Sequence, residues 1–240
     1  MTDVAVLEPR QRTLVQLVTL LRPGRDTHRG VYRSIEWGAE RCGRVLAQRS
    51  YGARVLLHGS HATLAALVSV LDEASADAHV HAVDLLLNPH GTTRRLWFAD
   101  GPAEADQISS MLQGALDPAQ RRRLRAVFST ACFGMCHTDT WLRAGFSVAV
   151  GSRGIYADGL TSLPLLLRGW ARGLTVEECV RRADSERLRR RADIVASRYY
   201  ERTGRLADAE QVDSHRVVDG ARTMTIGSDP TTWRPSRLPA

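Results

Sequence analysis

The sequence contains no lysine, so all 33 of its basic residues are arginines. A formal net charge of +7 would suit an acidic partner such as a nucleic acid. The arginines are, however, dispersed among 26 acidic residues, and their densest clusters are short runs at 121–125 and 187–191. Because a nucleic-acid footprint gathers on one face, we expect no nucleic-acid partner. Exclusive use of arginine is typical of codon bias in a GC-rich genome.

Long apolar runs and paired cysteines are also missing. No stretch reaches the ~20 apolar residues that span a bilayer, and the start, MTDVAVLEPRQR, lacks the pattern of a secretory signal. The cysteines have no CxxC spacing, which argues against a disulfide scaffold. They are Cys42, Cys132, Cys136 and Cys179. We therefore expect a cytoplasmic protein in a reducing compartment, with no membrane partner.

What the sequence does contain is an alternation of short apolar runs and segments with helical periodicity. This alternation predicts an α/β fold, a mostly parallel β-sheet sandwiched between α-helices. The expected strands are 53–59, 80–88, 124–132, 146–154 and 215–227. The expected helices are 12–21, 32–49, 61–75, 103–116, 138–145 and most of 162–200, which is broken near Gly169 and Gly173.

The segment 92–101 alternates and ends in a turn, which predicts a small hairpin arm. We expect one domain over residues 1–228, with a helical N-terminal extension at 1–50 and a flexible tail at 229–240.

Two reactive side chains follow the ends of two expected strands. His90 and Gly91 come after the strand at 80–88, and Cys132 closes the strand at 124–132. In parallel sheets the chemistry lies outside the carboxyl ends of the strands. A thiol becomes a good nucleophile when an imidazole can take its proton. The N–H groups of Gly91 and Cys132 are candidate donors to an oxyanion.

The motifs VDLLLNPHG, with His90 and Gly91, and VFSTACFG, with Cys132, resemble the caspase-like cysteine peptidases. This group includes caspases, metacaspases, legumain, clostripain, gingipain and separase. The His-to-Cys separation of 42 residues is compatible with the roughly 50 of caspases. The resemblance spans 53–180 and implies a three-layer fold and a cysteine endopeptidase that needs no metal or cofactor. It implies that His90 and Cys132 are catalytic, that Gly91 helps hold the oxyanion, and that the partner is a protein or peptide substrate.

The chain departs from the family pattern near both motifs. Pro89 precedes His90, and Thr130 stands where metacaspase- and clostripain-like members carry an acidic residue. Arg or Lys specificity is therefore not supported from that position. The loop 151–162 corresponds to a part of the family's substrate cleft. Thr130, Arg153 and Asp158 are the candidate substrate-binding residues.

Several alternatives stay open at this point. Cys136, beside His137, is a second candidate nucleophile, although a loop or helix-cap role suits both residues better. A zinc site from His90, Cys132, Cys136 and His137 has only a weak spacing signal. An α/β hydrolase would need a Gly-x-Ser-x-Gly elbow, which is missing. The main alternative is a catalytically inactive caspase-like module that binds a protein partner. Whether the peptidase would need an activating partner protein is a separate open question.

Overall fold

The computed structural model describes residues 6–21 and 29–232. Its centre is a six-stranded sheet in the order β2-β1-β3-β6-β7-β8, in which only β8 runs antiparallel to its neighbour. The sheet strands are β1 Arg12–Thr19, β2 Ala53–His58, β3 Ala82–Pro89, β6 Leu124–Ser129, β7 Val148–Ser152 and β8 Arg216–Gly220. Strands β4 Arg95–Phe98 and β5 Gly101–Glu104 form a separate hairpin.

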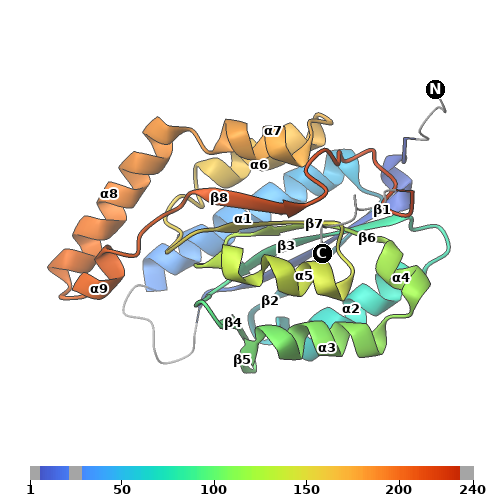
Figure 1. The fold of residues 1–240 in the computed structure, drawn as a ribbon, viewed down its shortest axis with the longest axis horizontal. Coiled ribbons are helices and arrows are strands. Elements are labelled where there is room, and N and C mark those ends of the chain that lie inside the picture. Colours follow the sequence, from blue (N-terminus) through green and yellow to red (C-terminus); the bar gives the residue numbers. More distant parts are fainter. Residues whose placement is uncertain (1–5, 22–28, 233–240) are drawn as a thin grey trace, which may run out of the picture.

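Helices cover both faces of the sheet (Figure 1). One layer buries apolar side chains of α1, α6 and α7, and the other those of α2, α3 and α5. The helices are α1 Arg29–Ser50, α2 Leu64–Ala76, α3 Ala105–Ala115, α4 Pro118–Arg122, α5 Thr138–Ala144, α6 Ser162–Ala171, α7 Val176–Ala183, α8 Glu186–Arg202 and α9 Leu206–Ala209. This three-layer arrangement confirms the expected fold class.

The helix expected over 12–21 is wrong. Residues 12–19 form β1, which pairs with β2 on one side and β3 on the other and is buried along its whole length. A strand that is buried on both faces of a sheet lacks the alternation of apolar and polar residues that marks a strand. The segment LVQLV therefore fits a helix equally well. The helical N-terminal extension is therefore wrong over these residues, because they lie inside the sheet.

The other expected elements are confirmed, with shifts of a few residues at their ends. The hairpin arm is β4–β5, and the helical region after 162 divides into α6, α7 and α8 close to the two glycines. The last strand is shorter than expected, since β8 ends at Gly220. The expected flexible tail lies mostly in 233–240, outside the described residues. Among those described, no helix is both long and apolar enough to cross a bilayer.

Candidate active site

The two reactive residues of the sequence lie at the same edge of two neighbouring strands. Strands β3 and β6 are parallel partners, and Leu87 is in register with Ser129. His90 and Cys132 each follow three residues later, so both lie beyond the carboxyl ends of the same strand pair. The cross-strand hydrogen bond from the Thr130 N–H to the Leu87 carbonyl, at 2.9 Å, extends the pairing toward them.

Gly91 lies directly against the backbone of Cys132. A Cβ added to Gly91 would lie 2.4 Å from the Cys132 carbonyl oxygen and 3.4 Å from its nitrogen. Only glycine allows this approach without movement of the backbone. The bridge between Gly91 and Leu96 uses the N–H groups of Thr92 and Trp97, so the Gly91 N–H takes no part in it.

The turn after Cys132 has an unusual backbone. Phe133 adopts φ 56° and ψ 29°, the left-handed region that non-glycine residues rarely occupy. Its N–H donates to the Gly154 carbonyl at 2.8 Å, and its carbonyl accepts from the Cys136 N–H at 2.9 Å. These bonds hold a strained conformation in place. Strain of this kind gathers at functional sites.

The imidazole of His90 is held by the end of β1. Its Nε2 lies 2.8 Å from the carbonyl oxygen of Leu20, so Nε2 carries the proton and donates. The ring of Tyr32, on α1, meets it edge-on with centroids 4.9 Å apart. In a neutral imidazole with this tautomer, Nδ1 holds the lone pair that can accept a proton.

Cys132 keeps some accessible surface but is densely surrounded by protein atoms. Burial raises the pKa of its thiol to about 12; the Asp208 carboxylate adds to the rise, while its own N–H and the Arg205 guanidinium oppose it. Burial also raises the pKa of Tyr200 to about 12, with the charge of Cys132 contributing. Tyr200 is on α8 and Asp208 on α9, which lie at the end of the sheet where the parallel strands finish (Figure 1).

His137 has a role that its sequence context did not reveal. It is 1% exposed, and its Nε2 lies 2.7 Å from the carbonyl oxygen of Thr92, in the loop after Gly91. Burial lowers the pKa of the imidazole, which favours its neutral form. His137 therefore braces the loop after His90 and Gly91 from the short 3-10 helix, Gly134–His137, that precedes α5. Its neighbour Cys136 is exposed.

Two of the candidate substrate-binding residues lie close to Cys132 in the chain or in space. The Thr130 hydroxyl accepts from the Asn88 Nδ2 at 2.7 Å, so it links β6 to β3. Arg153 follows β7 with an exposed side chain, and its N–H donates to the His215 carbonyl at 2.9 Å. The roles of both in substrate binding stay predictions.

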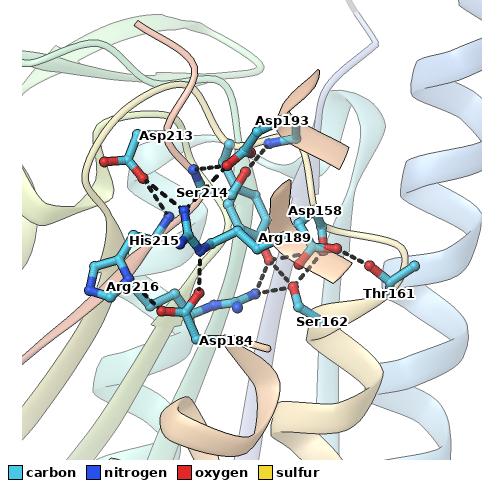
Figure 2. A network of polar contacts seen from close by, with 12 residues as sticks. Asp158, Thr161, Ser162, Asp184, Arg189, Asp193, Asp213, Ser214, His215 and Arg216 are labelled. Carbon is cyan, nitrogen blue, oxygen red and sulfur yellow. Dashed lines mark hydrogen bonds and ion pairs between the residues drawn. The ribbon is translucent and has the colours of Figure 1, made fainter. Parts of the chain in front are cut away.

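Asp158 lies deeper, in a polar network between the loop after β7, helix α6 and helix α8 (Figure 2). It is 2% exposed, and its carboxylate accepts from the Thr161 hydroxyl. Burial raises its pKa to about 6. Arg216 nearby is also buried and donates to the Ser162 hydroxyl at 2.6 Å. Burial lowers the pKa of this guanidinium to about 9. That Asp158 binds substrate stays a prediction.

His58 belongs to the same edge of the sheet but does not neighbour His90. Strand β1 lies between their strands, so β2 and β3 are not neighbours in the sheet. The imidazole of His58 contacts two α1 carboxylates, Glu36 at 3.6 Å and Glu40 at 3.4 Å. In the described part of the chain, no group of three His, Cys, Asp or Glu side chains is arranged to hold a metal ion.

No protein-family profile and no curated protein sequence matches the chain. Solved structures do match it, and the similarity is one of fold, a mostly parallel sheet between helices. The chain is similar to gingipain R, an Arg-specific cysteine proteinase, with a TM-score of 0.53 and 10% identity. The match covers 91% of this chain and 48% of gingipain R, so the chain spans about half of that protein's length. It is also similar to the Drosophila initiator caspase Dronc, with a TM-score of 0.48, 9% identity and 76% of each chain covered.

Proposed function

We propose that this protein is a cysteine endopeptidase in which His90 and Cys132 form the catalytic dyad of a single domain over 1–228. The observation that carries the proposal is the β3–β6 register, in which the pair Leu87 and Ser129 lies three residues before His90 and Cys132. The hydrogen bond from His90 Nε2 to Leu20 supports it, because it leaves Nδ1 as the proton acceptor. The fold shared with gingipain R is consistent with a protein or peptide substrate.

In the proposed reaction the Cys132 sulfur attacks the carbonyl carbon of a peptide bond while His90 takes the thiol proton. The N–H groups of Gly91 and Cys132 stabilise the oxyanion that forms on the carbonyl oxygen. The C–N bond then breaks, and His90 gives its proton to the leaving amine. A water molecule, deprotonated by His90, attacks the acyl-enzyme and releases the carboxylate product and the thiol.

The raised pKa of Cys132, about 12, constrains this chemistry. Near pH 7 the thiol is protonated, so the sulfur must lose its proton to His90 as it attacks or after the surroundings open. Thr130 and Arg153 are the proposed substrate contacts near it, and Asp158 is a proposed contact deeper in the loop 151–162. A protein partner that displaces α8 and α9 would reduce the burial of the thiol, which is how an activating partner would act.

The experiment is cleavage of a diverse peptide library in reducing buffer, read by mass spectrometry, for the wild type and the Cys132→Ala and Cys136→Ala variants. Cys136→Ala is the matched control, because it removes a nearby exposed thiol. We expect the wild type and Cys136→Ala to make the same cuts and Cys132→Ala to make none. Cuts that persist in Cys132→Ala would overturn the assignment of the nucleophile.

The alternative is a catalytically inactive module that binds a protein partner, and the high pKa of Cys132 is the observation that favours it. The two functions differ in the reactivity of this thiol, measured as the rate of iodoacetamide labelling between pH 6 and 9. An enzyme predicts fast labelling that His90→Ala abolishes. An inactive module predicts slow labelling that rises about tenfold per pH unit and ignores His90→Ala.

A further inference from the structure

Glu36, on α1, is a buried carboxylate whose partners are backbone groups at the end of β1. Its side chain is 4% exposed. One oxygen, Oε1, accepts hydrogen bonds from the N–H of Leu20 at 2.7 Å and from the N–H of Leu21 at 3.0 Å. The other oxygen, Oε2, lies 3.6 Å from Nε2 of His58. Among the described residues, no arginine forms an ion pair with it.

The peptide unit that joins Leu20 to Leu21 links this carboxylate to His90. Its N–H, which belongs to Leu21, donates to Glu36. Its carbonyl, which belongs to Leu20, accepts from Nε2 of His90 at 2.8 Å. The same peptide plane is thus held at both ends. A carboxylate on the N–H side polarises the amide and strengthens its carbonyl as an acceptor.

We propose that Glu36 is a positioning residue for His90 and that it acts through the Leu20–Leu21 peptide. This inference rests on the proposed function, in which His90 is the proton acceptor for Cys132. Glu36 fixes the direction of the Leu20 carbonyl, and the carbonyl fixes the imidazole with its proton on Nε2. The lone pair then stays on Nδ1, and the positive charge that His90 gains during attack faces a polarised carbonyl.

The residues that Glu36 connects lie at the ends of three neighbouring strands. His58 ends β2, Leu20 follows β1 and His90 follows β3, and these three strands are adjacent. Glu36 contacts the first two and reaches the third through one peptide. Glu40, one helical turn further along α1, contacts only the outer member, with its Oε1 3.4 Å from His58 Nδ1. Glu40 is therefore a matched control with the same charge on the same helix.

The test compares Glu36→Ala, Glu36→Asp, Glu36→Gln and the control Glu40→Ala in the full chain. The first readout needs no catalysis: long-range ¹H–¹⁵N spectra report which nitrogen of His90 carries the proton. We expect a single Nε2–H tautomer in the wild type, in Glu40→Ala and in Glu36→Gln, whose amide oxygen can still accept both N–H bonds. We expect a mixture of tautomers in Glu36→Ala and in Glu36→Asp, whose shorter side chain draws the carboxylate away.

The second readout is peptide cleavage. For Glu36→Ala we expect kcat to fall about 10- to 100-fold with KM within about twofold, because misdirection of a catalytic group affects the chemical step. Glu36→Gln should recover most of this loss. A general loss of folding would instead lower the active fraction and would not be repaired by a neutral amide.

An unchanged His90 tautomer in folded Glu36→Ala would overturn the inference. If Glu36→Ala does not fold, an unchanged tautomer in Glu36→Asp would overturn it instead. If the tautomer responds as expected while no variant cleaves any peptide, the positioning role holds and the proposed peptidase activity fails. The two hypotheses therefore fail in different experiments.

Discussion

Polar side chains at the two ends of the β3–β6 strand pair differ in the kind of partner that they have. At the amino end Asp84 of β3 meets Arg125 of β6, both 0% exposed, through hydrogen bonds of 2.9 and 2.6 Å. At the carboxyl end, His90 and Cys132 each follow the same strand pair by three residues, and the thiol of Cys132 is densely surrounded by protein atoms. The first end uses its polar groups on one another. At the second end, the interactions run to other parts of the chain: from His90 to Leu20 and Tyr32, and from Cys132 to the charges of Asp208 and Arg205.

The difference extends to the surroundings of each pair. Asp84 also accepts from the hydroxyl of Tyr51 and from the Ala126 N–H at 3.1 Å, and Trp170 donates to Tyr51 at 3.0 Å. All of these bonds lie inside the protein. A saturated charge pair is structural, whereas a strained turn such as that at Phe133 beside a poorly solvated thiol is characteristic of chemistry.

The largest expected effect comes from removing the ion pair at the amino end of the β3–β6 strand pair. Arg125→Met leaves the Asp84 carboxylate buried without its ion pair, so we expect the free energy of unfolding to fall by about 3–5 kcal/mol. Urea unfolding followed by circular dichroism measures the change. The control is Arg95→Met, which removes an exposed ion pair with Glu104 and should cost under about 1 kcal/mol. Equal losses in the two variants would contradict the comparison.

A smaller loss of stability, with a large loss of activity, is expected at the carboxyl end. In Gly91→Ala the new Cβ would lie 2.4 Å from the Cys132 carbonyl oxygen, so the backbone of one turn must move. We expect unfolding free energy to fall by about 1–3 kcal/mol and peptide cleavage to fall about 100-fold. Gly114→Ala is the control, because a Cβ there meets nothing within 4 Å. Full cleavage activity in folded Gly91→Ala would mean that the close approach is unimportant.

The smallest expected effect is a pH dependence of protein stability that comes from Asp158. Asp84 has an arginine partner, whereas the contacts of Asp158 are hydroxyls, and burial raises its pKa to about 6 from an ordinary value of 3.8. Stability that comes from protonated Asp158 is complete below about pH 4 and is lost as pH rises through 6. Between pH 4 and 7 the wild type should therefore lose about 1–2 kcal/mol relative to Asp158→Asn.

Melting temperatures of the wild type and Asp158→Asn at several pH values test this. Asp117→Asn provides a control of opposite sign. Hydrogen bonds from backbone N–H groups lower the pKa of Asp117, so its contribution is present above its ordinary pKa and is lost as pH falls. Parallel pH curves for the wild type and Asp158→Asn would contradict the prediction.

Most of the sheet could be predicted from the sequence because strands such as 82–89 are apolar runs bounded by turn residues. β1 could not. Its polar residues are satisfied by partners that the sequence does not reveal, such as Gln16, which donates to the Ala39 carbonyl at 2.9 Å and accepts from Arg54. A strand whose polar groups are paired across elements has no local signature.

The wrong prediction of a helix over 12–21 also explains which residues near His90 were not predicted. The position of His90 and Cys132 just after the carboxyl ends of two strands followed from the general rule for parallel sheets. The Leu20 carbonyl, Tyr32 and Glu36 depend on β1 lying beside β3, so a chain with a helix at 12–21 gives no reason to place them near His90. His137 was missed for a related reason, since its partner is a backbone carbonyl 45 residues away.

The pairing register of β3 and β6 has a consequence for how such proteins diverge. The β3–β6 pairing sets the relation between His90 and Cys132, and most of the 41 residues between them belong to the crossover, which carries the hairpin β4–β5 and helices α3 and α4. That crossover can grow or shrink without changing the pair. What stays constant is the number of residues from the last paired residues of β3 and β6 to His90 and Cys132, which is three on each strand. The number of residues between His90 and Cys132 can change. A search for relatives by fixed motif spacing would therefore pass over chains that keep the same geometry.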